Sequence, residues 1–263
     1  DDAVSAVKEG ETVTVVADVD LGEERIEIYQ KNFTLDLNGK TVKSSCAEDV
    51  SYYNSGIVVI EDGSICIKNG SIINEDTSSI HGYAYALAVT GGSVTLENVN
   101  AVGGLCGGKR CYAVFVYPGL DATLNVKSGI YKGGLSVGRK YIGGMGAFSP
   151  NVYLSGGTFI KDTNDYAIKN VNILSKTDRI SDILEEGFAF AEYNEEESAA
   201  GAIVNGYSLR NAPYSVAVVS HASHSINADF ECSECGAKME ASHSKIQTGN
   251  REYFKTRDSA IAS

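Results

Sequence analysis

The chain of 263 residues has no tryptophan, only 3 prolines and only 4 histidines, and none of its apolar runs reaches 18 residues. Without such a run, no segment is expected to span a membrane as a helix. Few prolines suit a protein built of strands, because a residue inside a sheet must donate its backbone N–H. Three of the histidines lie beyond residue 220, so the chain does not indicate a serine triad.

Positive charge is also scarce. Lysine and arginine number 22 against 34 acidic residues, which gives a formal net charge of −12 at pH 7. Nucleic-acid binding requires a basic footprint, so we expect no nucleic-acid partner. The chain begins at Asp1 without methionine or a signal peptide, and we expect it to be one trimmed module of a longer protein.

What the sequence does contain is a phrase that recurs five times. Each copy alternates apolar and polar residues over four positions and then reaches Asn, Ser or Gly, as a half-buried strand followed by a turn would do. The starts lie 30, 29, 30 and 28 residues apart, at Thr34, Ser64, Ser93, Thr123 and Asn151. A fixed period of this length is typical of a solenoid, whose units bury their apolar faces by stacking on one another.

A second short strand fills each period. Residues 85–89, 112–116 and 166–168 begin with the same Tyr-Ala pair, and residues 56–60 occupy the slot before them. Two strands per period without a helical pattern predict an all-β fold, a parallel β-helix solenoid with about five to six coils. An antiparallel sandwich is the alternative, although its strands do not normally repeat a sequence at one period.

Both ends of the chain are expected to cap this solenoid, because the first and last coils would otherwise expose strand edges and core. A short helical turn from Asp2 to Lys8 precedes the first strand, and a helix from Ser181 to Gly187, with Ser181 as its N-cap, follows the last coil. We therefore predict a β-helix with its N-terminal cap over residues 1–175, a C-terminal cap over 176–219, and a small Cys/His-containing appendage or linker over 220–263.

These segments also resemble a known family. Residues 11–19 and 33–42 resemble the right-handed, pectate-lyase-like β-helix modules of large cell-surface proteins from Gram-positive gut and oral bacteria. Residues 183–190 resemble the closing segment of such modules, and the stretch from His221 to Gly236 resembles the Cys/His-rich pieces that often follow. The resemblance implies an extracellular, cell-wall-associated, adhesin-like protein that contacts polysaccharide or glycoprotein. The same fold carries polysaccharide lyases and hydrolases, so it does not by itself decide the function.

The strongest chemical motif consists of His221, His224, Cys232 and Cys235. Two imidazoles and two thiolates satisfy the tetrahedral coordination of zinc, and each close pair can chelate from one turn. We therefore expect a structural zinc ion as the only cofactor. A disulfide between Cys232 and Cys235, or two thiols, is the alternative.

The other four cysteines are less informative. Cys106 and Cys111 flank a Gly-Gly-Lys-Arg loop whose glycines let the chain bend, so these two residues can close a small disulfide. Cys66 aligns with Asp36 at an outward position of the repeat, and the sequence indicates no partner for Cys46 or Cys66.

A candidate ligand site follows from the repeat. Counting 17 residues from the starts of three successive repeats reaches one basic residue each time. With their neighbours, these residues would form a basic and aromatic stripe suited to an anionic glycan. The predicted stripe consists of His81, Lys109, Arg110, Tyr112, Arg139, Lys140 and Tyr141. The alternative is a set of solvated turns and a packing ladder of tyrosines.

No catalytic residues stand out. A glycosidase needs two carboxylates about 5–10 Å apart, whereas Asp36 and Glu97 are expected two coils apart with Cys66 between them. A β-eliminating lyase needs a basic residue and usually a cluster of acidic calcium ligands, which the sequence does not show. We expect a cell-surface module that binds or adheres to glycans or glycoproteins. A carbohydrate-active enzyme and a structural spacer are the alternatives.

Overall fold

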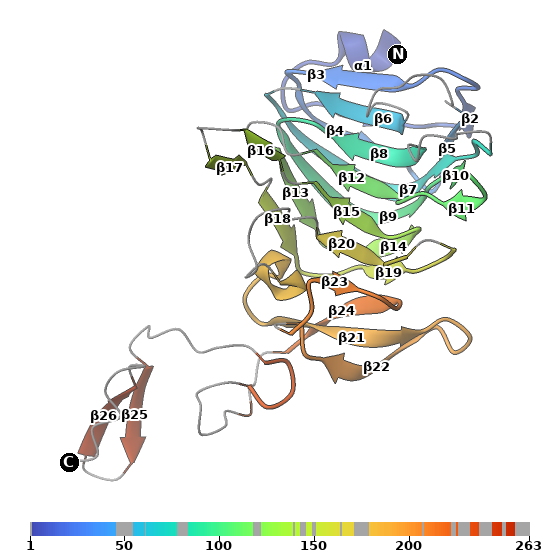
Figure 1. Ribbon diagram of the computed structural model, residues 1–263. Helices are drawn as coiled ribbons and strands as arrows, with labels where there is room; N and C mark the ends of the chain where they lie inside the picture. Colours follow the sequence, from blue (N-terminus) through green and yellow to red (C-terminus); the bar gives the residue numbers. More distant parts are fainter. Residues whose placement is uncertain are drawn as a thin grey trace.

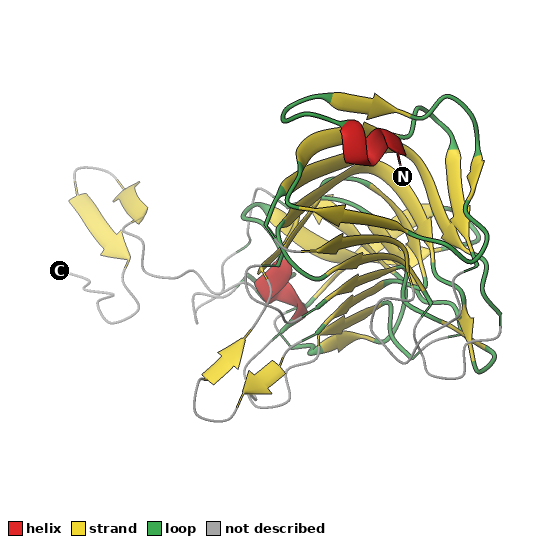
Figure 2. Cartoon of the chain, turned by 90° about the horizontal axis from the view of Figure 1, so that it is seen from above, coloured by secondary structure: helices red, strands yellow, loops and turns green. Residues whose placement is uncertain are grey.

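The computed structural model shows a β-solenoid of stacked parallel coils, which confirms the predicted all-β solenoid (Figure 1). It describes residues 2–45, 55–60, 62–77, 84–117, 122–138, 140–142, 146–148, 151–163, 165–170, 179–206, 208–221, 225, 232–236, 244–248 and 251–255. The view along the stack shows the strands of successive coils lying over one another (Figure 2).

Two sheets form the walls of the solenoid. Sheet B contains, in spatial order, β3 (Ile26–Tyr29), β6 (Ser55–Ile60), β8 (Tyr85–Val89), β12 (Val114–Val116), β15 (Leu135–Val137) and β20 (Ile168–Asn170), all parallel, and then the antiparallel β23 (Asn211–Ala212). The parallel part of sheet A contains β1 (Thr12–Thr14), β2 (Val19–Asp20), β4 (Asn32–Asp36), β5 (Thr41–Ser44), β7 (Ser64–Asn74), β9 (Ser93–Val102), β13 (Thr123–Val126), β14 (Gly129–Lys132), β18 (Asn151–Leu154) and β19 (Thr158–Ile160).

The coils stack in register, so equivalent residues meet. Five buried aliphatic side chains form one such column in sheet A: Leu35, Ile67, Leu96, Val126 and Leu154. The register places Asn32 opposite Ser64, so the first copy of the phrase begins two residues before Thr34. A shift of two residues keeps every side chain on its predicted face, because strand side chains alternate with a period of two.

Two coils differ in where they carry an insertion. The coil of β9 adds the antiparallel hairpin β10 (Leu105–Cys106) and β11 (Lys109–Arg110) before it reaches β12. The next coil passes from β14 to β15 through Gly133 and Gly134 alone. Gly134 has a φ of 77°, and a Cβ at this position would collide with the backbone of Ala167. Its hairpin, β16 (Lys140–Ile142) and β17 (Gly146–Phe148), follows β15 instead.

Caps close both ends of the stack. Helix α1 (Asp2–Ala6) buries Val4 at the N-terminal end and confirms the short helical turn that the sequence predicts there. At the other end, β24 (Val216–Ser220) pairs antiparallel with β19, and β21 (Phe188–Asn194) and β22 (Ala199–Val204) follow outward. The division of the chain at residues 175 and 219 stays a prediction.

Two details of the C-terminal part complete the fold. The helix expected from Ser181 to Gly187 is wrong: the chain forms the 3₁₀ helix η1 (Ile180–Ile183), with Arg179 as N-cap and Ser181 buried inside it. The Asp182 carboxylate accepts the Arg179 backbone N–H at 2.8 Å, which fixes the start of the helix two residues early. Beyond the cap, β25 (Ser244–Thr248) and β26 (Arg251–Lys255) form an antiparallel hairpin.

We expect Leu96→Ala to lower the free energy of unfolding by about 2–5 kcal/mol, because it leaves a cavity in a packed column. Leu96 is 0% exposed and stacks between Ile67 and Val126. Urea unfolding followed by circular dichroism measures the effect. Thr95→Ala, on the outward side of the same strand, is the control and should cost about 1 kcal/mol or less. Equal losses for the two variants would contradict the interior stacking.

Candidate functional site

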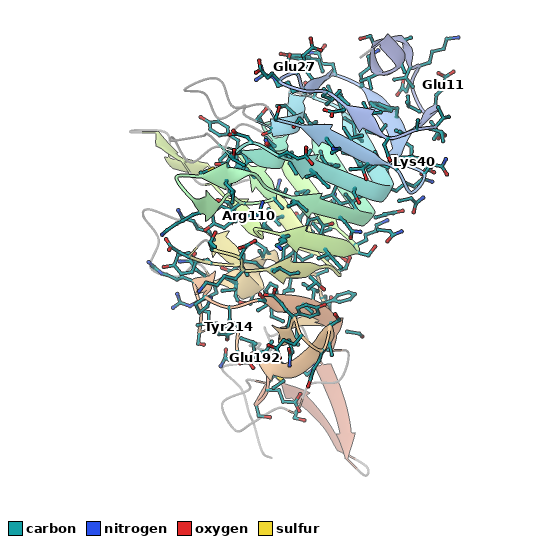
Figure 3. All side chains as sticks on the ribbon, turned by 90° about the vertical axis from the view of Figure 1, so that its right-hand side faces the viewer. Glu11, Glu27, Lys40, Arg110, Glu192 and Tyr214 are labelled. Atoms are coloured by element: carbon teal, nitrogen blue, oxygen red, sulfur yellow. A yellow bond between two sulfur atoms is a disulfide. The ribbon has the colours of Figure 1, made fainter. Side chains whose placement is uncertain are left out.

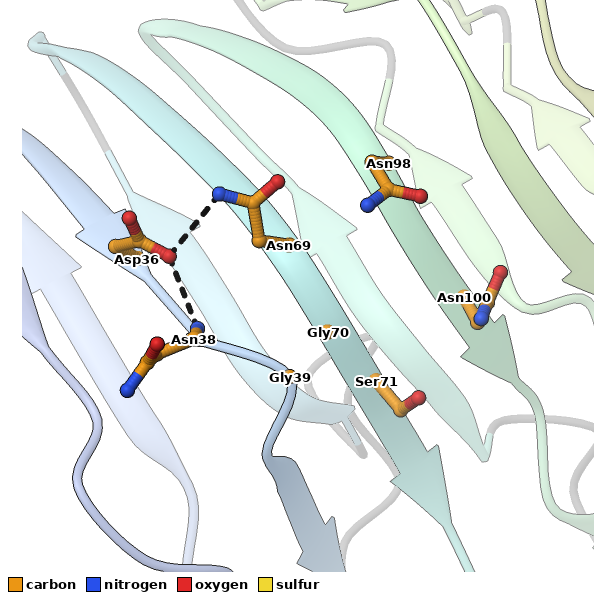
Figure 4. Close-up of a pocket in the computed structure, with 8 residues that line it drawn as sticks. All are labelled: Asp36, Asn38, Gly39, Asn69, Gly70, Ser71, Asn98 and Asn100. Atoms are coloured by element: carbon orange, nitrogen blue, oxygen red, sulfur yellow. Dashed lines mark hydrogen bonds between the residues drawn. The ribbon is translucent and has the colours of Figure 1, made fainter.

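A polar groove crosses sheet A where its strands bend (Figure 4). Its volume is about 520 Å³, within the range of small-molecule sites. It extends over three neighbouring coils, those of β4, β7 and β9. Its lining consists of small and polar residues, namely Asp36, Asn38, Gly39, Asn69, Gly70, Ser71, Asn98 and Asn100.

The bend has a local cause that repeats in three successive coils. Asn38, Asn69 and Asn98 have φ values of 51°, 57° and 54°, in the left-handed region. Asparagine enters this region more readily than other residues with a side chain, because its short carboxamide can hydrogen-bond locally. Gly70 lies against Leu37 and Lys40 of the preceding coil, where a Cβ would have no room. The sequence analysis treated these asparagines only as turn residues and missed the groove that they line.

Asp36 supplies the groove with a negative charge. Its Oδ1 accepts the backbone N–H of Asn38 at 2.9 Å and the Asn69 carboxamide at 3.2 Å, and the Lys68 ammonium lies 3.6 Å from Oδ2. The hydrogen bond from Asn38, together with those from Asn69 and the charge of Lys68, lowers the pKa of the Asp36 carboxyl from its ordinary value. The group is therefore ionised at neutral pH.

Other groove groups remain available to a ligand. The Asn98 side chain is exposed and the Ser71 hydroxyl is half-buried, and neither hydrogen-bonds to protein within the described part of the chain. Asn100 is also exposed, and its carboxamide oxygen accepts the Ile130 backbone N–H at 3.2 Å. The groove thus presents an amide, a hydroxyl and an ionised carboxylate over three coils.

A row of alternating charge runs beside the groove. The register places Lys68 between Asp36 and Glu97, where the sequence analysis expected Cys66, and Cys66 lies opposite Thr34 and Thr95 instead. Lys68 pairs with Asp36, and Lys127 pairs with Glu97. Each carboxylate therefore contacts a lysine of a neighbouring coil. Burial raises the pKa of the Cys66 thiol, so this group stays protonated at neutral pH.

Two basic residues of the predicted stripe, Lys109 and Arg110, contact carboxylates. Arg110, labelled in Figure 3, donates from Nε to Asp162 at 3.1 Å and from Nη1 to the Gly103 carbonyl at 2.9 Å. The Lys109 ammonium lies 3.4 Å from Asp165. These contacts fasten the β10–β11 hairpin to the segment between β19 and β20, and they offset the positive charge.

The structure does not stack Lys140 on Arg110. Strands β12 and β15 pair with each other, yet Arg110 precedes β12 while Lys140 and Tyr141 follow β15 in β16. The two hairpins project from different sides of the stack in Figure 1. Repeats of similar length conceal this difference because their insertions lie at different corners. His81 and Arg139 lie outside the described residues, and a ligand-binding role for the stripe stays a prediction.

The tyrosines that begin the second strand do recur in register. Val114 pairs with Leu87 and Leu135, and Leu135 pairs with Ile168, so Tyr85, Tyr112, Gly133 and Tyr166 occupy equivalent positions. Tyr141 does not belong to this series. Burial, with Asp165 and Tyr166 nearby, raises the pKa of the Tyr112 hydroxyl well above its ordinary value. A half-buried, neutral phenol is consistent with packing at this corner.

Three side chains that could together bind a metal ion lie at the C-terminal cap. His221, Cys232 and Cys235 are 8%, 2% and 4% exposed, and their donor atoms all lie within 4.8 Å of one another. The His221 Nε2 is 3.4 Å from the Cys232 sulfur, and its Nδ1 is 3.8 Å from the Glu234 carboxylate. The sequence analysis identified this group, and the fold brings its three described members together. His224 lies outside the described residues.

The cysteines divide into two kinds. Cys106 and Cys111 form the disulfide that the sequence allowed, across the turn of the β10–β11 hairpin. Cys66, Cys232 and Cys235 are thiols, so the alternative of a Cys232–Cys235 disulfide is not what the structure shows. Cys46 lies outside the described residues.

Comparisons with known proteins add no relative. No family model matches the chain, and neither the search of curated proteins nor that of solved structures found a significant match. Among the described residues no helix combines the length and apolarity needed to cross a membrane. The β-solenoid is the part of the expected resemblance that the structure shows.

We expect Arg110→Ala to lower the free energy of unfolding by about 1–3 kcal/mol, because it removes charge-assisted hydrogen bonds from a partly buried group. The Arg110 and Asp162 side chains are only 23% and 20% exposed. Lys109→Ala is the matched control, since Lys109 and Asp165 are 63% and 73% exposed. Its loss should be about 0–1 kcal/mol. Urea unfolding compares the two, and a Lys109 effect equal to that of Arg110 would contradict the anchoring role.

Proposed function

We propose that this protein is an extracellular module that binds glycans, free or carried by glycoproteins, in the groove of sheet A. The observation that carries the proposal is the polar groove itself, with Asp36, Ser71 and Asn98 on successive coils. Carboxamides, hydroxyls and carboxylates are groups that exchange hydrogen bonds with sugar hydroxyls. The groove is open and spans several coils, so it suits a chain better than a compact small molecule.

The charges favour a neutral glycan. Asp36 places an ionised carboxylate in the groove, and this charge repels an acidic sugar. The residues that line the groove in the described part of the chain include no lysine or arginine, and the neighbouring Lys68 already contacts Asp36. In the basic stripe, Lys109 and Arg110 contact Asp165 and Asp162, so these carboxylates already offset their positive charge. A neutral sugar can donate hydroxyl hydrogens to Asp36 without this repulsion. The net charge of −12 supports the same preference.

The disulfide supports an extracellular, cell-surface location. Disulfides persist in oxidising compartments and are rare in reducing ones. The Cys106–Cys111 bond closes a hairpin whose Arg110 is tied to a neighbouring segment, so it serves as a structural bond. Adhesion to a surface glycan is the role that this location and the groove support together.

A second proposal concerns the cofactor. We infer that the ion suited to His221, Cys232 and Cys235 is zinc and that its role is structural. Imidazole and thiolate ligands favour zinc over magnesium or calcium, which prefer oxygen. All three donors are buried, whereas a catalytic zinc needs a position open to substrate.

The binding proposal is tested with Asn98→Gly combined with Ser71→Ala. Glycine keeps the left-handed backbone at position 98 and removes only the carboxamide, so the coil should retain its bend. We expect affinity electrophoresis in gels containing neutral polysaccharides to show retention of the wild type and at least roughly tenfold weaker binding of the variant, equivalent to about 1.4 kcal/mol. Asn151→Ala, an exposed asparagine of sheet A outside the groove, is the control and should bind normally.

The same incubations should be scored for new polysaccharide chain ends. Retention without new ends supports the binding module, and retention of acidic polysaccharides only would contradict the preference for neutral sugars. New chain ends would favour a carbohydrate-active enzyme. The absence of both retention and cleavage would favour a structural spacer. Equal binding by the wild type and the variant would show that the groove is not the binding site.

A further inference from the structure

The outermost strands of the C-terminal cap have two different faces. On one face, Phe190 of β21 and Val204 of β22 belong to the core of the solenoid. Ala189 and Ile203 lie on the other face, because neighbouring strand residues point to opposite sides. That second face contacts a separate small cluster made with Cys232 and Cys235. Residues 232–236 therefore cover the side of the cap that faces away from the core.

This cover has little apolar area of its own. The cluster consists of Ala189, Cys232 and Cys235, with Ile203 packed against it. Burial of a few small side chains gives a weak driving force, whereas ordering a stretch of backbone has a substantial entropic cost. Short segments with so small a core usually depend on a disulfide or a metal ion. The cysteines are thiols here, so a disulfide is not the bond that holds them.

We propose that one zinc ion bound by His221, Cys232 and Cys235 clamps residues 232–236 onto β21 and β22, beside the end of β24, and thereby closes the C-terminal end of the solenoid. The clamp rests on the zinc site proposed above and adds its structural purpose. Tetrahedral zinc with one sulfur and one nitrogen ligand places these two donor atoms about 3.5 Å apart. The distance from His221 Nε2 to the Cys232 sulfur is 3.4 Å.

The surrounding backbone positions these donors. His221 directly follows β24, and its N–H donates to the Gly187 carbonyl at 2.7 Å, which ties it to the start of β21. The turn that carries both cysteines is closed by the Gly236 N–H, which donates to the Cys232 carbonyl at 2.9 Å. Gly236 has a φ of 75° and lies so close to the Asn205 carboxamide that a Cβ would not fit. Each donor is thus held by a segment that contacts the cap.

The Glu234 carboxylate supports the same arrangement. It lies 3.8 Å from His221 Nδ1, on the opposite side of the ring from the cysteine sulfur. Histidines that bind metals commonly direct their second ring nitrogen toward a carboxylate, which orients the ring. The fourth ligand of such a closed, structural zinc site would be a further side chain.

Metal content is the first measurement. The full chain, purified without a histidine tag in the presence of zinc, should contain about one zinc per molecule. Cobalt in place of zinc should give the intense visible absorption of a tetrahedral site with thiolate ligands. Cys232→Ser should lower zinc content at least tenfold. Cys66→Ser, which changes a thiol on sheet A, is the matched control and should leave it unchanged.

Hydrogen exchange of the wild type then tests the clamp, and it does not depend on a variant that folds. Removal of zinc by a chelator should speed exchange at least tenfold in β21, β22 and residues 232–236, and leave β7 and β9 unchanged. A chain that takes up neither zinc nor cobalt overturns both the site and the clamp. A chain that binds zinc but shows the same exchange with and without it keeps the site and overturns the clamp.

Discussion

The hydrogen-bonded ladder between neighbouring coils is the constraint on which the rest of this structure depends. Parallel, in-register pairing forces each side chain to meet its equivalents in the coils before and after it. Inside, Leu96 therefore meets Ile67 and Val126, while one residue further on Glu97 lies between Lys68 and Lys127 outside. One alternating phrase thus determines both a continuous aliphatic core and a surface of paired charges.

The same ladder converts a local backbone preference into a surface feature. A single asparagine with positive φ would make only a kink, but Asn69 and Asn98 bend neighbouring strands at the same level. Because coils stack about 4.8 Å apart, the bends align into a groove and bring Asp36, Ser71 and Asn98 within reach of one extended ligand. In such a groove, the contacts to a ligand are made by equivalent residues of successive coils. No single residue stands out in the sequence as a binding residue.

Structural features that depend on the alternation of apolar and polar residues can be predicted from the sequence. Features that depend on the lengths of the loops in each coil cannot. The inward columns follow from period-two patterning, and the series of Tyr85, Tyr112 and Tyr166 follows from the repeated Tyr-Ala pair. Even the two-residue error at Thr34 left every face correct. The prediction that Arg110 and Lys140 lie in one stripe assumed that repeats of equal length have their loops at the same corner of the coil, and the register does not bear this out. One coil has its inserted hairpin before β12, and the next has its hairpin after β15. The length of the repeat is therefore nearly the same in both coils. His221, Cys232 and Cys235 were recognisable because metal-ligand chemistry is read from residue type and short spacing, which do not depend on the path between them.

A ladder that bonds only neighbours also leaves an unpaired edge at each end, and a further strand merely moves that edge outward. Strands β24, β21 and β22 extend sheet A in this way, with the direction changed from parallel to antiparallel. An interaction outside the ladder is one way to end the series. The group of His221, Cys232 and Cys235 lies on the face of β21 and β22 opposite the core, so it can join strands across the sheet without offering another edge. The proposed zinc clamp would account for the gathering of buried thiols and an imidazole where the solenoid stops, in a chain whose other described cysteine pair is already a disulfide.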